Sequence, residues 1–377
     1  MLTYMTKLTQ KYDLHHLIGL CVVRRFLGLA YLNISFIFPL VGAVQLVKQF
    51  PFKRLRIEIL LLLFLAILSF IRLLFFYSGT SLVRSIQFTF IIFGFDYICL
   101  KFSEADYVKT SKLIVSLVAV GALIELMCGE SQEVTKLIGI GSFVVRRMHG
   151  VAGEANYTTL VVLGVFSLFF YKKMWKFSIL CIPLWLSTFS RMFLIGFAVL
   201  VILYFLEKKY KNLARLFSRV LLVICFLLPF IYFSIDRYAR LNIGDELFQS
   251  LSYNLEVFTS GRSIIASKYI EILLDNPFGV GYFNTPFLQE QFKSGLFKNK
   301  NFFQEHSLYL QIMVSLGFLG GGILFAFFWK VINIASKNRK LVLLGPMIVS
   351  MAFVNGSHDF IIYMIFAYSI KEVSLES

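Results

Sequence analysis

The chain has 377 residues, of which 58% are hydrophobic and 17% aromatic, and its formal net charge at pH 7 is +16. Only 15% of the residues are charged, whereas about a quarter are charged in a soluble domain. Together with a mean hydropathy of +0.77, this composition excludes a soluble globular protein and indicates a polytopic membrane protein. In such a protein the positive charge reflects basic cytoplasmic loops, so we expect no nucleic-acid partner.

Apolar runs follow one another along the whole chain, and a bilayer span needs about 20 such residues. The runs lie at 27–47, 57–76, 81–100, 110–128, 154–171, 177–189, 192–206, 218–234, 306–329, 341–354 and 358–370. The connections alternate between basic ones and ones that are nearly free of lysine or long. Because basic loops face the cytoplasm, the alternation predicts that segments 129–150 and 235–305 lie outside.

Two stretches leave the number of spans open. Residues 177–206 are too long for one span and short for two, but both of their flanks are basic. Two short helices that turn at Ser190 and Arg191 keep both flanks in the cytoplasm, and we prefer this interpretation. Residues 12–26 are half apolar and are interrupted by Arg24 and Arg25, which fits an interfacial helix or an extra span. We expect about eleven or twelve spans in total.

These patterns predict an all-α fold, a polytopic helix bundle with one long extracytoplasmic loop. We expect an N-terminal transmembrane bundle over 1–234, the extracytoplasmic loop over 235–305, and C-terminal spans over 306–377, all within one membrane domain.

The long loop is expected to be partly helical. Its apolar residues recur at helical spacing over 263–274. Ser260 and Gly261 precede this segment as a plausible start, and Asn276 and Pro277 follow it as a stop. Two interpretations stay open: an ordered loop that lies on the spans, or a small lid over an outward-facing cavity.

Arginines at the outer edge of the membrane are the first candidates for binding. They are Arg191, Arg262 and the pair Arg146 and Arg147. A charge near the apolar zone costs roughly 2.5 kcal/mol or more, so it is a functional candidate or a paired group. Arg191 interrupts the apolar run WLSTFSRMFLIGF, and its plain alternative role is snorkelling to headgroups. The planar arginine fork suits bidentate phosphate binding, so the cluster indicates an anionic, phosphate-bearing ligand.

His306 and Glu154 are the remaining candidates on the outer side. His306 begins an apolar run and can act as a general base on a hydroxyl, or simply as an interfacial or capping residue. Glu154, in HGVAGEANY, can pair with an arginine. The sequence has no HEXXH, GxSxG or Walker-type motif and no Asp-rich pair on the outer side. We therefore expect neither a metal site nor a cofactor.

Five short motifs occur in a particular order on this chain. They are GEANY at 153–157, STFSR at 187–191, GRS at 261–263, NPFGVG at 276–281 and EHSLYLQIMVSLGFLG at 305–320. With many spans and one long outer loop, this order resembles the O-antigen polymerase and ligase family of membrane glycosyltransferases. Ser307 departs from the family pattern, which more often has Asn after the histidine.

The resemblance implies a GT-C-like, metal-independent, inverting glycosyltransferase on the outer side of the bacterial cytoplasmic (inner) membrane. Its donor would be a glycan on undecaprenyl diphosphate. By the same resemblance, Arg191 and Arg262 hold the donor diphosphate and His306 deprotonates the acceptor hydroxyl. Arginines can stabilise the charge that develops on a diphosphate leaving group in place of a metal.

The acceptor separates the alternatives within this family. A polymerase transfers the chain to another lipid-linked repeat of O-antigen or capsule, and a ligase transfers it to lipid A core; we favour the polymerase. The partners would then be lipid-linked glycans, the bilayer and a chain-length regulator. The alternative from another class is a flippase or transporter for lipid-linked oligosaccharides. It predicts charges deep in several spans, where the first half of the chain has Arg72, Arg84, Asp96 and Glu125.

Overall fold

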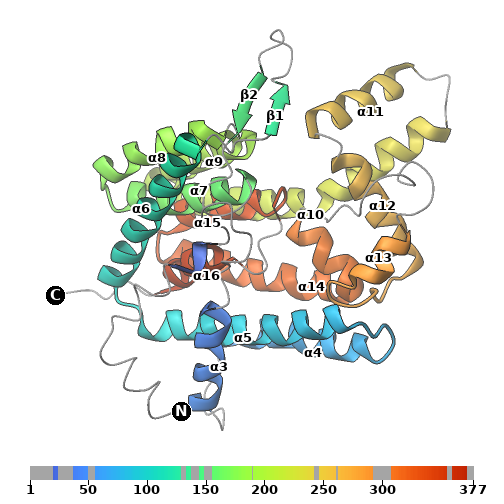
Figure 1. Ribbon diagram of the computed structural model, residues 1–377, viewed down its shortest axis with the longest axis horizontal. Helices are drawn as coiled ribbons and strands as arrows, with labels where there is room; N and C mark the ends of the chain where they lie inside the picture. Colours follow the sequence, from blue (N-terminus) through green and yellow to red (C-terminus); the bar gives the residue numbers. More distant parts are fainter. Residues whose placement is uncertain are drawn as a thin grey trace.

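Helices packed side by side make up nearly all of the structure, a computed structural model (Figure 1). It describes residues 20–23, 37–49, 56–128, 133–136, 144–147, 155–188, 190–241, 246–259, 262–291, 307–354 and 359–371.

The described residues of the first half form eight helical elements and one small sheet, beginning with a short 3-10 turn. They are η1 (Leu20–Val22), α3 (Ile37–Gln49), α4 (Ile57–Leu73), α5 (Gly79–Lys101), α6 (Glu104–Cys128), β1 (Glu133–Lys136), β2 (Val144–Arg147), α7 (Ala155–Tyr171), α8 (Trp175–Thr188) and α9 (Arg191–Lys209). The described residues of the second half form helices joined by short loops and turns. It contains α10 (Lys211–Leu241), α11 (Glu246–Thr259), α12 (Arg262–Asp275), α13 (Thr285–Gln291), α14 (Leu308–Lys337), α15 (Leu341–Ser350) and α16 (Phe360–Ile370).

Within the described residues, four helices are long and apolar enough to cross a membrane: α5, α6, α10 and α14. Shorter apolar helices occur at 37–48, in α7, in α15 and in α16. This confirms the predicted all-α polytopic membrane fold. The number of spans and the division into two transmembrane regions and a loop stay predictions.

Two local predictions are confirmed. The apolar stretch 177–206 forms two helices, α8 and α9, which separate at the predicted turn before Arg191. The helix expected at 263–274 is α12. Both are cases in which a polar or turn-forming pair lies between periodic apolar residues, and such signals are local.

α10 is longer than the apolar run at 218–234 predicted, because it includes both flanks. At its N-terminal end the basic side chains have partners on α14: Arg215 Nε donates to Ser336 Oγ at 2.9 Å, and Arg219 Nη2 donates to Asn333 Oδ1 at 2.7 Å. At the other end the helix continues to Leu241, past the expected start of the loop at residue 235. Hydropathy detects the apolar centre of such a helix and misses its polar ends.

α15 and α16 form a buried pair of short helices. With 10 and 11 residues, they are about 15 Å and 17 Å long, roughly half of the 30 Å hydrocarbon core. Lys340 Nζ donates to the carbonyls of Tyr368 at 2.9 Å and Lys371 at 2.8 Å, which joins the start of α15 to the end of α16. Every residue of both helices is buried. Because Lys340 joins the start of α15 to the end of α16, the turn at 351–354, which follows the end of α15, lies at the opposite end of this pair.

Candidate active site

Arg191 is the first residue of α9, at a junction of three helices. Ser190, the residue before it, donates through Oγ to Asn156 Oδ1 of α7 at 3.4 Å. The indole of Trp185 in α8 donates to the Ser190 carbonyl at 3.2 Å and stacks on Phe193 of α9, with ring centroids 4.6 Å apart. These contacts place Arg191 beside the first turn of α7. Glu154 lies one residue before α7 and outside the described residues.

Arg262 is the first residue of α12 and is half-buried. Its Nη1 donates to the carbonyl of Phe353, 3.0 Å away, in the turn that follows α15. The same turn holds the start of α14, because the Leu308 N–H donates to the Met351 carbonyl at 2.9 Å. His306 lies two residues before Leu308 and outside the described residues. The turn 351–354 thus brings Arg262 to the beginning of the helix that follows the predicted base.

The packing of α9 on α15 relates Arg191 to this turn. The Glu207 carboxylate, near the end of α9, accepts from the N–H groups of Leu341 and Val342 at 2.8 Å and 3.2 Å, at the start of α15. Earlier in α9, Leu203 faces Gly345, where a Cβ would lie 2.1 Å from its Cδ1. The two helices are therefore antiparallel. The start of α9 and the turn after α15 consequently lie toward the same end of the bundle.

Arg146 and Arg147 lie in the antiparallel hairpin of β1 and β2, where Arg147 is opposite Glu133 and Arg146 is opposite Val134. Figure 1 shows these two strands, which follow α6 and precede α7 in the chain, projecting from the helical body. Only the backbone of these two arginines is described. Their proposed part in substrate binding stays a prediction.

α14 has a break near its N-terminal end that the sequence did not indicate. Gly317, in the run LGFLGGG, has φ 73° and ψ −172°, a conformation that L side chains rarely adopt. In an unbroken helix the Phe318 N–H would donate to the Val314 carbonyl. Here Phe318 instead donates to a carbonyl of the NPFGVG loop.

The loop at 277–281 supplies three hydrogen bonds of 3.0 Å to the break: Phe318 N–H to the Pro277 carbonyl, Val280 N–H to the Val314 carbonyl, and Gly281 N–H to the Ser315 carbonyl. A buried backbone group without a partner is costly, above all in a membrane protein. The loop therefore supplies hydrogen-bond partners to the backbone groups of α14 that the break leaves without a partner inside the helix. NPFGVG, which the sequence predicts to be a turn and which is one of the five motifs of the family resemblance, therefore docks against α14.

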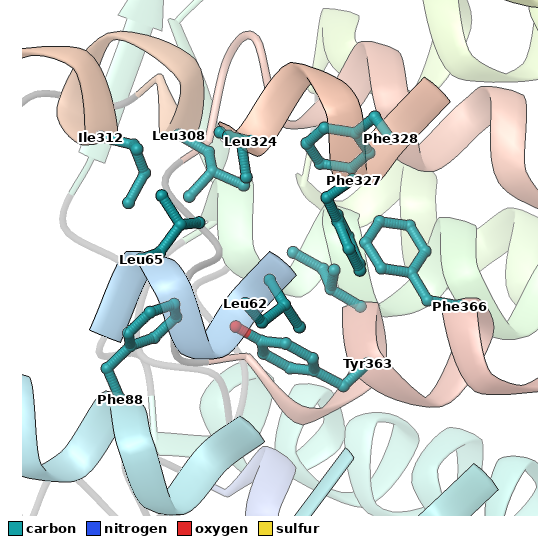
Figure 2. Close-up of a pocket in the computed structure, with 11 residues that line it drawn as sticks. Leu62, Leu65, Phe88, Leu308, Ile312, Leu324, Phe327, Phe328, Tyr363 and Phe366 are labelled. Atoms are coloured by element: carbon teal, nitrogen blue, oxygen red, sulfur yellow. The ribbon is translucent and has the colours of Figure 1, made fainter. Parts of the chain in front are cut away.

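A narrow cavity lies between α4, α5, α14 and α16 (Figure 2). Its lining is apolar apart from the phenol of Tyr363, with side chains such as Leu62, Phe88, Leu308 and Phe327. Such a lining offers a sugar or a diphosphate almost no hydrogen-bond partners. The cavity is therefore not the binding site for the polar part of a glycan donor. Among the described residues, no group of three or more His, Cys, Asp and Glu side chains could hold a metal ion.

The fold and the arginine-bearing helix ends define a polytopic helical membrane protein. Residues 155–326, just under half of the chain, match the family model described as "O-Antigen ligase". Searches of curated proteins and of solved structures found no match.

The family match confirms the resemblance to O-antigen polymerases and ligases. It covers the chain from α7 into α14, including Arg191, Arg262 and the NPFGVG loop. It indicates a membrane function of the O-antigen ligase or polymerase type and a glycosyl-transferring enzyme.

Proposed function

We propose that the chain is a glycan polymerase of the bacterial cytoplasmic membrane. It would transfer a growing glycan from undecaprenyl diphosphate to a new lipid-linked repeat unit, on the outer face of the membrane, and so build O-antigen or capsular polysaccharide. The observation that carries this proposal is the arrangement of Arg191, Arg262 and the start of α14 toward one end of the bundle.

In the proposed reaction the two arginines bind the donor diphosphate through their planar forks. The acceptor hydroxyl attacks the anomeric carbon while His306 takes its proton as general base. The bond between that carbon and the diphosphate oxygen breaks, with inversion of configuration. The negative charge that develops on the leaving diphosphate is stabilised by the guanidinium groups, so the proposal includes no metal and no cofactor.

The ligase is the second candidate, because the matched family is described as "O-Antigen ligase". It would use the same donor chemistry and a different acceptor, lipid A core. The flippase is the third candidate and would use the arginines for binding alone.

The surface glycan of a strain that lacks the gene tests these three functions. A single repeat unit on the acceptor, restored to a ladder by the wild-type gene, supports the polymerase. Loss of all glycan from lipid A core, with long chains on the lipid carrier, supports the ligase. Loss of every externally exposed lipid-linked unit supports the flippase and rejects both transferases.

Complementation with variants then tests the residue roles. His306→Ala and Arg191→Ala should each give membrane-inserted protein that makes no polymer. His16→Ala, a histidine of the N-terminal segment, is the matched control and should restore the ladder. A normal ladder from His306→Ala would remove the general base from the proposal.

A further inference from the structure

We propose that Arg72 is a positioning residue of this transferase. Its guanidinium holds the loop 277–281 in the break of α14 and thereby fixes the N-terminal segment of that helix, residues 308–316, which begins two residues after His306. The inference rests on the proposed function for the role of His306. We call the contacts of Arg72 and its neighbours with this loop the clamp. These contacts do not depend on the proposed function.

Arg72 lies in the last turn of α4, and its partners explain why a charge is kept at the end of an apolar helix. Nη2 donates a hydrogen bond to the Gly279 carbonyl. The guanidinium carbon also lies 5.0 Å and 5.4 Å from the ring centroids of Phe76 and Phe75, within range of a cation–π contact. A hydrogen bond from a charged donor is about twice as strong as a neutral one. The loop carbonyl is the backbone group that this arginine holds.

On its other side, Gly279 lies directly against the break. Its φ is 85°, and a Cβ there would lie 2.5 Å from the Gly317 nitrogen and 2.5 Å from the Ser315 carbonyl oxygen. The loop therefore approaches α14 as closely as two backbones allow. Arg72 closes the arrangement from the side of α4, so the loop is held between two helices.

Aromatic contacts extend the same clamp along the loop. Phe76 meets Phe287 edge to face with centroids 5.7 Å apart, and Phe88 of α5 packs on Tyr282 at 5.2 Å. Figure 1 shows α13 and the adjacent part of α14 beside the end of α4. These apolar contacts hold the loop near the helices, whereas the Arg72 hydrogen bond fixes the backbone of Gly279 itself.

The N-terminal segment of α14, residues 308–316, is consequently held at two points. Leu308 is bonded to the Met351 carbonyl at its start, and the loop is bonded to Val314 and Ser315 near its end. If the loop shifts, residues 308–316 lose their second support, and the start of the helix at Ser307 and Leu308 shifts with them. An error of about 1 Å at a catalytic group can reduce a rate by about a hundredfold. Arg262, which we propose as a diphosphate-binding residue on α12, donates to the Phe353 carbonyl and not to the Gly279 carbonyl of this loop in the bond described above.

The experiment uses the full-length protein in lipid nanodiscs, with Arg72→Ala, Arg72→Lys and Arg219→Ala. Arg219 is the matched control, because it contacts the part of α14 that follows the break, by a hydrogen bond to Asn333 and a ring contact with Trp329 at 4.5 Å. Hydrogen exchange is measured at the amides of Val280 and Gly281. Transfer kinetics use the lipid-linked oligosaccharide extracted from the deletion strain.

Arg72→Ala should speed exchange at the two loop amides by about tenfold or more. It should lower kcat by about tenfold or more and leave KM for the donor within about twofold. Arg72→Lys, which can still donate one bond to the carbonyl, should recover most of both. Arg219→Ala should leave both at the wild-type level.

Unchanged exchange at the loop amides in Arg72→Ala overturns the clamp. Faster exchange with unchanged kcat overturns the positioning role, and a rise in KM alone would place Arg72 in donor binding instead. If the wild-type protein transfers no glycan, the proposed function fails. The exchange data still decide whether Arg72 holds the loop.

Discussion

The guanidinium of Arg262 donates from Nη1 to the backbone carbonyl of Phe353, 3.0 Å away. This bond joins the first residue of α12 to the turn that also carries the start of α14. A guanidinium has its donors in a rigid plane, so one bond to a fixed carbonyl orients the whole fork. The turn after α15 therefore sets the direction of an arginine to which the family resemblance gives a role in diphosphate binding.

Arg262→Lys should impair polymer formation although it preserves the charge. A lysine presents a point charge in place of the fork, and it reaches the Phe353 carbonyl and a phosphate less well together. We expect about a tenfold or larger loss of polymer at equal amounts of membrane-inserted protein. Arg237→Ala is the control, since the exposed Arg237 lies over the ring of Phe233 at 5.7 Å. A normal ladder from Arg262→Lys would contradict a bidentate role.

Gly317→Ala should strongly destabilise the protein, whereas Gly322→Ala should not. At Gly317 a Cβ would lie 2.3 Å from the Pro277 carbonyl oxygen, and φ is positive. We expect a loss of about 2 kcal/mol or more in the free energy of unfolding. Gly322, in the same helix, has open space around its Cβ position, and alanine there gains up to about 1 kcal/mol of helix propensity. Thermal unfolding in detergent compares the two, and equal melting temperatures would argue against the break at Gly317.

Glu207→Ala should lower stability by removing the cap of α15. The carboxylate is 8% exposed and accepts hydrogen bonds from the N–H groups of Leu341 and Val342. Loss of such a cap costs about 1 to 2 kcal/mol, and Glu207→Gln should cost less because the amide oxygen still accepts. Lys208→Ala, at the exposed neighbouring residue, should be close to neutral. Chemical or thermal unfolding of the three variants gives the order, and a neutral Glu207→Ala would contradict the cap.

Lys340 should make stability depend on pH in the alkaline range. Burial lowers the pKa of its ammonium to about 8 from an ordinary value of 10.5. Between these values the unfolded state binds more protons than the folded state, so the contribution of Lys340 to stability rises with pH. It is fully present above 10.5 and is lost as the pH falls through about 8.

The melting temperature of wild type minus that of Lys340→Met should therefore increase from about pH 7 to about pH 9.5. Lys337→Met, at an exposed position of the same connection, should show no such trend. A constant difference across this range would mean that Lys340 keeps an ordinary pKa in the folded protein.

Much of the candidate site rests on features that are local in sequence. The apolar runs, the interruption at Ser190 and Arg191, and the helix after Gly261 depend on residues a few positions apart. These features were sufficient for the helical membrane fold, for the separate helices α8 and α9, and for α12. His306 and Glu154 lie outside the described residues, so their predicted roles remain to be tested by mutation.

The sequence by itself determined that the protein is a helical membrane protein and where Arg191 and Arg262 fall relative to its apolar runs, because the length of a span and the position of a charge can be read along the chain. The tertiary structure alone decided that α9 and α15 are antiparallel, that Arg262 meets Phe353, and that the NPFGVG loop docks in α14. It also gave Arg72 a partner 207 positions away. Such contacts depend on backbone groups that lose their contact with water when distant segments fold together and then need a hydrogen-bond partner within the protein.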